Sequence, residues 1–162
     1  MIHGRPSAQV PSFVAEAFTG ILYDAEAALV VAPLQNYALI GRRPAIAWHP
    51  SPALDRAIEA AMPLLTAAER VTFIIGDPED STTDLPDLAA TLRNRGIRID
   101  TDRFTTDRTH DTGEQIRARA LAGGADMLIM GAWTRPRFLE WLFGGPTQDV
   151  LSRATLPVLT HH

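Results

Sequence analysis

Short apolar runs alternate with segments of helical spacing along most of the chain. From residue 43 onward, five runs have the length and composition of strands, at 44–49, 71–75, 97–104, 126–131 and 156–160. Two of them, "VTFII" and "DMLIMG", are almost continuously apolar. Such runs are typical of strands that are buried on both faces of a parallel sheet.

The segments between these runs predict helices. Ser51 is a candidate N-cap with Pro52 at the first helical position, and one face then carries Leu54, Ala57, Ile58, Ala61 and Leu65. Pro63 predicts that this helix kinks or ends early. Further helices are predicted over 85–96 and 111–124, where glycines give the stop signals. Strands alternating with helices predict an α/β fold, a parallel sheet with right-handed connections.

Residues 1–42 differ from the domain predicted over 43–162. The stretch "SFVAEAFTGILYDAEAALVVAP" predicts one helix followed by one short strand at 28–31. This N-terminal extension is too short to form a domain of its own.

The length and charge of the chain narrow the classes of function. The 162 residues correspond to one domain, and the net charge of -4 with no basic run argues against nucleic acid or an anionic membrane as partner. No apolar stretch has the length of a membrane span, and "MIHGRPSAQV" lacks the features of a secretory signal. We therefore expect a cytoplasmic protein. The absence of cysteine excludes disulfides and a thiol nucleophile.

Glycines mark the region where chemistry is expected. Gly131 ends the apolar run at 126–131, and Gly144 and Gly145 precede the short helix predicted in "PTQDVLSRA". In open parallel sheets, ligands bind at the carboxyl ends of the strands where the strand order reverses. A glycine at such an end lets the backbone approach a phosphate, and a helix N-terminus adds N–H donors.

Two stretches carry a resemblance to a known family. "ADMLIMGAWTRPRFLEWLFGGPTQDVLSRATLPVLTHH" and "AIAWHPSPALDRAIEAAMPLL" resemble the C-terminal half and the first strand and helix of the universal stress proteins, so that residues 42–162 are covered. The resemblance implies a Rossmann-like, nucleotide-binding α/β fold whose five parallel strands have the order 3-2-1-4-5. It also implies a stress-response regulator, either a single-domain member or the C-terminal domain of a tandem-type member.

The resemblance also implies a nucleotide site. Nucleotide-binding members carry Gly, two residues, Gly, nine residues, Gly and then Ser or Thr, and these positions fall on Gly131, Thr134, Gly144 and Gly145. Thr134 therefore replaces a glycine, and Gly145 replaces a hydroxyl. The full candidate set is Ala47, His49, Gly131, Thr134, Arg135, Arg137, Gly144, Gly145 and Thr147. His49 stands where such members place an aspartate, and the arginines and threonines keep positive charge and hydroxyls near the loop.

Two functions stay open on this evidence. The first is weak binding of an adenine nucleotide, ATP or AMP, through a degenerate glycine loop. The alternative is a dimeric scaffold or partner-binding protein that binds no nucleotide and keeps the glycines for backbone geometry. The chain lacks the "HxGH", "SGG" and "GK[ST]" signatures of related nucleotide enzymes, so we expect no enzyme, and slow ATP hydrolysis ranks last.

The histidines and acids elsewhere have simpler explanations than a catalytic or metal site. Asp107, His110 and Asp111 precede a predicted helix, where Asp111 fits a cap better than a metal ligand. His161 and His162 are expected to form a frayed terminus.

The sequence of the N-terminal strand at 28–31 predicts that it pairs with the last strand. "EAALVV" aligns with "ATLPVL" of the last strand, so residues 1–42 resemble the closing helix and strand of a preceding domain. In the family the final strand commonly pairs antiparallel with that of a partner, which implies a homodimer through the final strand, the N-terminal extension, or both. We therefore expect the strand at 28–31 to lie against 156–160, within the chain or exchanged across a dimer.

Overall fold

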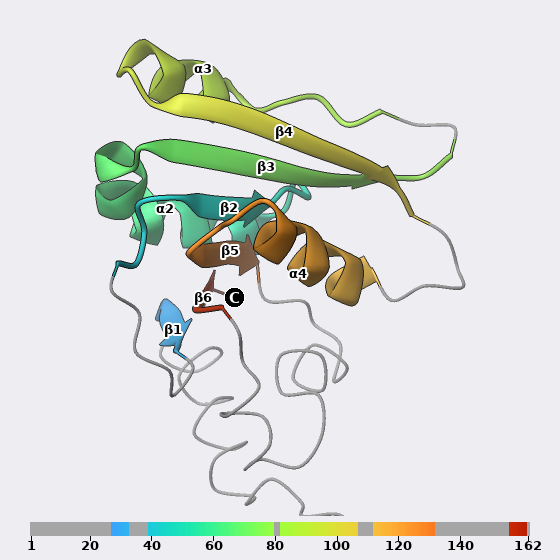
Figure 1. The fold of residues 1–162 in the computed structure, drawn as a ribbon, viewed down its shortest axis with the longest axis horizontal. Helices are drawn as coiled ribbons and strands as arrows, with labels where there is room; N and C mark the ends of the chain where they lie inside the picture. The colour runs from blue at the N-terminus through green and yellow to red at the C-terminus, as the bar shows by residue number, and fades with distance from the viewer. Residues whose placement is uncertain (1–26, 33–38, 80–81, 107–111, 132–155, 162) are drawn as a thin grey trace, which may run out of the picture.

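The computed structural model describes residues 27–32, 39–79, 82–106, 112–131 and 156–161 (Figure 1). The strands are β1 (Leu29–Val31), β2 (Pro44–Ala47), β3 (Arg70–Asp77), β4 (Arg98–Thr105), β5 (Met127–Gly131) and β6 (Val158–His161). The helices are α2 (Pro52–Ala67), α3 (Asp87–Asn94) and α4 (Thr112–Ala122). Strands and helices alternate from β2 to β5, as the hydrophobic pattern predicts.

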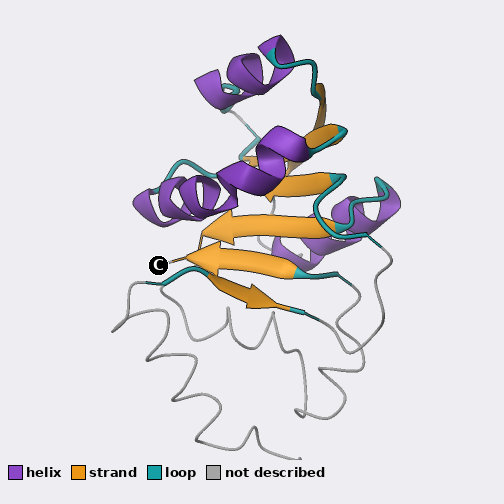
Figure 2. Ribbon diagram, turned by 90° about the vertical axis from the view of Figure 1, so that its left-hand side faces the viewer, coloured by secondary structure: helices purple, strands orange, loops and turns teal. Residues whose placement is uncertain are grey.

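The described strands form one mixed sheet in the order β1-β6-β5-β2-β3-β4 (Figure 2). β2 to β6 run parallel to their neighbours, and β1 alone is antiparallel, against β6. Counted from β2, the five parallel strands have the order 3-2-1-4-5. The sheet is larger than these five strands, because the short N-terminal strand adds a sixth at its edge. The helix predicted before that strand lies outside the described residues.

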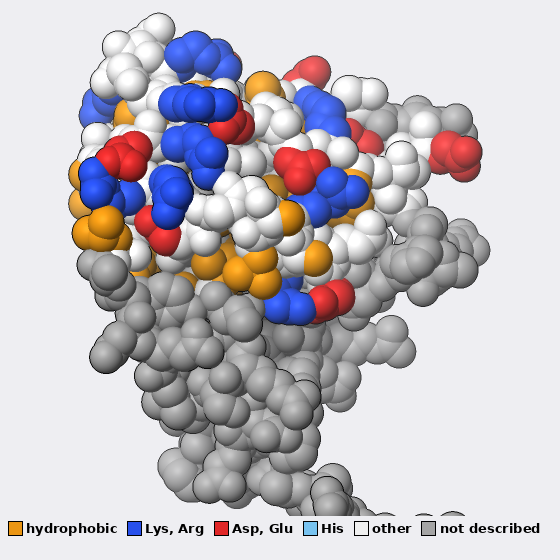
Figure 3. Space-filling view, viewed as in Figure 1, with side chains coloured by type: hydrophobic (Ala, Val, Ile, Leu, Met, Phe, Trp, Pro, Cys, Tyr) orange, Lys and Arg blue, Asp and Glu red, His pale blue; other side chains and the backbone are white. Residues whose placement is uncertain are grey.

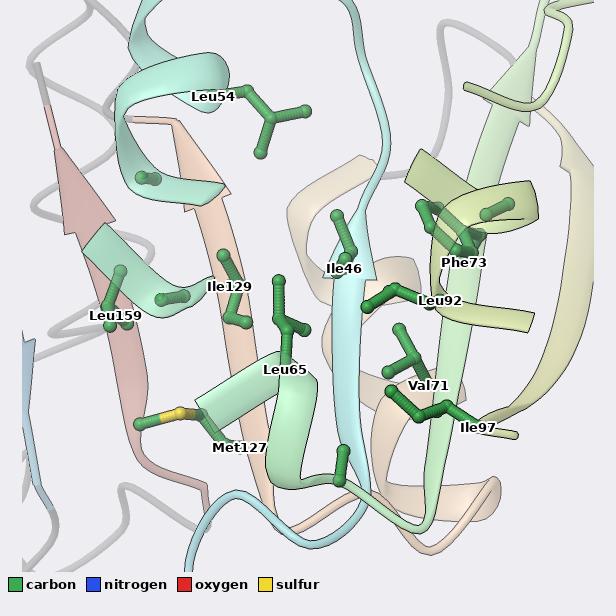
Figure 4. Close-up of a cluster of buried hydrophobic side chains, with 14 of the residues drawn as sticks. Ile46, Leu54, Leu65, Val71, Phe73, Leu92, Ile97, Met127, Ile129 and Leu159 are labelled. Atoms are coloured by element: carbon green, nitrogen blue, oxygen red, sulfur yellow. The ribbon is translucent and has the colours of Figure 1, made fainter. Parts of the chain in front are cut away.

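Helices cover both faces of the sheet, and each face has its own core. α2 and α3 lie on one face, where Leu65 and Leu92 pack against alternate strand residues such as Ile46, Phe73 and Ile129 (Figure 4). α4 lies on the other face, where Ile116 and Ala120 join a second buried cluster. The intervening strand residues point to that face, among them Ala45, Ala47, Ile74, Leu128 and Met130. The continuous apolar runs follow from this double burial.

α2 continues through Pro63, so of the two effects predicted for this proline, a kink or an early end, the early end is wrong. Pro63 is exposed, and the helix runs on to Ala67. Leu65, in the turn after the proline, is fully buried in the core. Burial of this side chain supports the last turn, so tertiary packing outweighs the hydrogen bond that a proline removes from a helix.

Asp126 joins the start of β5 to the segment that leads into β2. Its buried carboxylate accepts hydrogen bonds from three successive backbone N–H groups, those of Gly41 at 3.1 Å, Arg42 at 3.0 Å and Arg43 at 3.0 Å. Its own N–H donates to the carbonyl of Arg43 at 3.1 Å. Gly41 has a φ of 83°, which a residue with a side chain rarely adopts. The carboxylate therefore fixes where β2 begins relative to β5.

Charged side chains cover the β4 edge of the sheet. Asp100 of β4 pairs with Arg70 and Arg98, and Asp102 pairs with Arg119 of α4 at 2.8 Å. The face seen in Figure 3 accordingly shows basic and acidic side chains interleaved. Exposed pairs of this kind contribute little stability each, but charges along an edge strand disfavour pairing with another chain.

The opposite edge is covered by β1. Three residue pairs form the ladder, Leu29 with Thr160, Val30 with Leu159 and Val31 with Val158. Val31 is buried at 8% exposure, whereas Val30 is 49% exposed. The predicted pairing of the N-terminal strand with the last strand is thus formed within the chain, and it covers a β6 strand whose four residues are all buried.

Removing residues 1–40 should expose the β6 edge, because β1 is then lost while the hydrogen bonds of Asp126 to residues 41–43 remain possible. We expect the truncated protein to aggregate or to form a new dimer, as measured by size-exclusion chromatography with light scattering. A truncated form that stays monomeric, soluble and as heat-stable as the full chain would show that the extension does not protect this edge.

Candidate functional site

The strand order reverses at the neighbouring strands β2 and β5. The chain proceeds from β2 outward to β3 and β4 on one side, and β5 and β6 lie on the other. Ile46 pairs with Ile129, so the carboxyl ends of β2 and β5, at Ala47 and Gly131, lie nearly level at one edge of the sheet. The general rule for open α/β sheets places a ligand at this point.

Gly131 is required by close packing against helix α2. A Cβ atom at this position would lie 2.8 Å from the backbone nitrogen of Leu54 and 3.2 Å from the carbonyl carbon of Ala53. Gly131 is not among the described glycines with positive φ, so the contact with the helix backbone explains the glycine. The first turn of α2 therefore lies directly beside the end of β5.

Ser51 caps this turn as predicted. Its backbone is extended, and its Oγ accepts a hydrogen bond from the N–H of Leu54 at 3.2 Å. Pro52 follows at the first helical position and has no N–H to donate. The positive end of the helix dipole thus points to the carboxyl edge, but part of its donor capacity is already used within the chain.

The residues that follow β2 occupy different environments. Trp48 extends the ladder, because its N–H donates to the carbonyl of Ile74 at 2.9 Å. Its ring meets Phe73 edge-on, with 6.2 Å between ring centroids. Its indole Nε1 donates to the carbonyl of Asp84 at 3.1 Å, in the loop at 82–86 after β3. His49, the next residue, is exposed.

Asp77 is the buried acid at this edge, at the end of β3. Its carboxylate accepts hydrogen bonds from the N–H of Thr83 at 2.8 Å and from Arg103 at 2.9 Å. Hydrogen bonding by Thr83, with a smaller contribution from the Arg103 guanidinium, holds the pKa of Asp77 below its ordinary value, although burial acts in the opposite direction. Because both oxygens are engaged, Asp77 organises the loop and does not replace the aspartate expected at position 49.

His161 corrects the expectation of a frayed terminus. It is the last residue of β6, pairs with Gly131 across the ladder and is only 8% exposed. His162 lies outside the described residues. The buried position of His161 follows from the length of β6, which extends one residue beyond the predicted apolar run.

Most of the predicted loop lies outside the described residues. Ala47, His49 and Gly131 are described, and the structure brings the ends of their strands together. Thr134, Arg135, Arg137, Gly144, Gly145 and Thr147 belong to the part of the chain that is not described, as do Asp107, His110 and Asp111. The described residues contain no cluster of three or more side chains suited to a metal ion. Nor do they include a helix of the length and apolarity that a membrane span requires.

The comparisons with known proteins identify the family. The model of the Universal stress protein family matches residues 48–162, which is most of the chain. The chain belongs to the universal stress protein family. No curated protein sequence matches the chain.

One solved universal stress protein shows a similar fold. The structure of one from Archaeoglobus fulgidus DSM 4304 superposes with a TM-score of 0.58 at 20% identity, and the match covers 83% of this chain and 49% of that protein. This chain therefore spans about half the length of that relative. A family member from Burkholderia pseudomallei gives a TM-score of 0.42 at 17% identity, with 72% of this chain and 92% of that protein covered.

Two residues at the edge escaped the sequence analysis of this universal stress protein. Trp48 falls within the strand predicted at 44–49, although an aromatic residue directly before a polar turn is a recognisable signal. Asp77 follows the apolar run "VTFII" by two positions, and an acid there marks the end of a buried strand. Their partners, Asp84 and Arg103, lie too far along the sequence for spacing to reveal the contacts.

Replacing Gly131 with alanine should destabilise the protein, because the new Cβ would overlap the backbone of α2. We expect the free energy of unfolding to fall by about 2 kcal/mol, measured by chemical denaturation. Gly123→Ala, where the nearest atom outside the chain neighbours is 3.2 Å away at a helix end, should cost less. If Gly131→Ala is as stable as the wild type but changes ligand binding, the glycine serves the ligand and not the packing.

Asp77→Asn should make the free energy of unfolding depend less steeply on pH below neutral pH. The folded-state pKa of Asp77 lies below the unfolded value, so the unfolded chain binds more protons as the pH falls toward 4 and below. The contribution of Asp77 is therefore present above the unfolded pKa and is lost as the pH falls through the folded pKa. Urea denaturation from pH 7 to pH 3 measures this. An unchanged slope in the variant would contradict the assignment.

Proposed function

We propose that this universal stress protein is a stress-response regulator that binds an adenine nucleotide weakly at the carboxyl edge of β2 and β5. The observation that carries the proposal is the level pair of strand ends at the point where the strand order reverses, with the first turn of α2 packed against Gly131. The proposed role is binding and not catalysis, because no acid, base and nucleophile combination is placed at this edge by the sequence pattern.

The base and sugar would be held near the end of β2. Ala47 ends β2, and the imidazole of exposed His49, two residues later, can donate to or accept from a sugar hydroxyl. A neutral imidazole replaces the stronger acceptor that an aspartate provides, so this side of the site supports recognition at reduced affinity.

The phosphate side has fewer donors than nucleotide-binding members offer. Gly145 removes a hydroxyl, and Pro146 has no N–H. In the first turn of α2, the Leu54 N–H is taken by Ser51, and Pro52 donates nothing. Each hydrogen bond lost to a charged phosphate is worth about 1.5–3 kcal/mol, so two weaken binding by roughly two orders of magnitude or more. The shortage of donors favours adenosine or AMP over ATP.

One observation favours a second function. Packing against the helix backbone accounts for Gly131 without any ligand. A scaffold that binds a protein partner, or a second copy, and no nucleotide is therefore the competing proposal. The two proposals differ in a single measurable property, the affinity for adenine compounds.

Isothermal titration calorimetry of the full chain with adenosine, AMP and ATP tests the ranking. We expect adenosine and AMP to bind more tightly than ATP, with GMP as the control for the base. The double variant Thr134→Gly, Gly145→Ser should raise ATP affinity, because it returns a flexible turn and a hydroxyl donor to the loop.

The possible results separate the two functions. ATP binding at low micromolar Kd and tighter than AMP would overturn the proposed ranking. No binding of any adenine compound, by the wild type or by a normally folded double variant, would reject nucleotide binding in favour of the scaffold. Circular dichroism and thermal unfolding provide the control that the double variant is folded.

A further inference from the structure

Three hydrogen bonds from three neighbouring strands meet in the loop at 82–86. The indole of Trp48, after β2, donates to the carbonyl of Asp84 at 3.1 Å. The carboxylate of Asp77, at the end of β3, accepts from the N–H of Thr83 at 2.8 Å. Arg103 of β4 donates to the carbonyl of Thr83 at 2.8 Å and pairs with Asp77 at 2.9 Å. The loop is therefore held at two successive residues.

The Trp48 contact differs from the other two because it links the loops that follow two different strands. Asp77 and Arg103 connect the loop at 82–86 to β3 and β4, on the side away from β5. Trp48 connects the same loop to the segment between β2 and α2, which borders the point of strand-order reversal. Only this contact, among the three, fixes the position of the loop relative to the proposed site.

The geometry of Trp48 is suited to a fixed contact. Its backbone N–H continues the β2–β3 ladder, and its ring packs on Phe73, a fully buried core residue. The direction of the indole N–H is thus determined by the sheet and the core and not by the loop. A hydrogen bond from such a prearranged donor costs less side-chain entropy than one from a mobile surface group.

We propose that Trp48 is a positioning residue for the proposed adenine site, and that it acts by holding the loop at 82–86 against the end of β2. This inference rests on the proposed function. The base of AMP would lie near the end of β2, so the loop forms the neighbouring boundary of the site on the β3 side. With the loop held in place, the bound state requires less ordering of the chain, and affinity is higher.

Trp48→Phe tests the inference, because phenylalanine keeps an aromatic ring against Phe73 and removes the indole donor together with the second ring. Hydrogen exchange of the amides at 83–85, followed by mass spectrometry, should be about fivefold faster in the variant, as expected for one lost hydrogen bond. Calorimetry should show AMP affinity reduced by a similar factor, while the thermal unfolding temperature stays close to that of the wild type.

Thr66→Val is the matched control. Its hydroxyl donates to the carbonyl of Met62 at 2.9 Å in the last turns of α2, which lie toward the amino ends of the strands, away from the proposed site. This variant should change neither the exchange at 83–85 nor the AMP affinity.

Three other results would each contradict a different part of the proposal: the loop contact, the positioning role or the nucleotide binding itself. Unchanged exchange in Trp48→Phe would show that the indole does not hold the loop. Faster exchange with unchanged AMP affinity would show that the contact stabilises the loop alone, and the positioning role would be rejected. A wild-type protein that binds no adenine compound would reject the proposed function and, with it, this role of Trp48.

Discussion

The carboxylate of Asp126 is the contact on which the arrangement of the sheet depends most. Three consecutive backbone N–H groups that precede β2, one buried and two part-buried, have no strand to pair with and would be costly to leave without an acceptor. One carboxylate side chain satisfies all three and comes from the residue directly before β5. The two central strands therefore begin in a fixed relation, and their far ends, Ala47 and Gly131, come out level. The geometry of the proposed site, at the carboxyl ends of β2 and β5, is therefore set by a contact at their amino ends.

At the carboxyl edge, packing and ligand chemistry make overlapping demands on the same residues. Gly131 gives α2 its close approach, and that approach places the helix terminus beside the strand ends. Ser51 and Pro52 stabilise the start of the helix but reduce the donors that it offers to an anion. The contact with α2 is thus sufficient to explain Gly131. Evidence for phosphate binding has to come from other residues of the loop.

The elements of the fold were predictable because the strands are short runs of strand composition, two of them almost continuously apolar, that alternate with segments of helical spacing. Those five runs, with Ser51 and Gly96 as helix signals, correspond to β2 to β6 and to the ends of α2 and α3. The predicted early end of the helix at Pro63 is wrong, because burial of Leu65 outweighs the local effect of the proline. The roles of Asp126 and Trp48 were not predictable, because each depends on a partner many residues away, and Asp77 combines the nearby Thr83 with the distant Arg103. The nucleotide-binding role of all nine candidate residues stays a prediction, and six of them, from Thr134 to Thr147, lie outside the described residues.

The pairing of β1 with β6 has a consequence for the order in which the protein folds. Val31 pairs with Val158, so β1 can form its ladder only with a strand that lies more than a hundred residues later in the sequence. Loop closure over such a distance is entropically costly and contributes to slow folding. β2, β3 and β5 can assemble with α2 before that contact exists. During synthesis, the N-terminal segment therefore spends most of its time without its partner, and the sheet acquires its sixth strand as a late event.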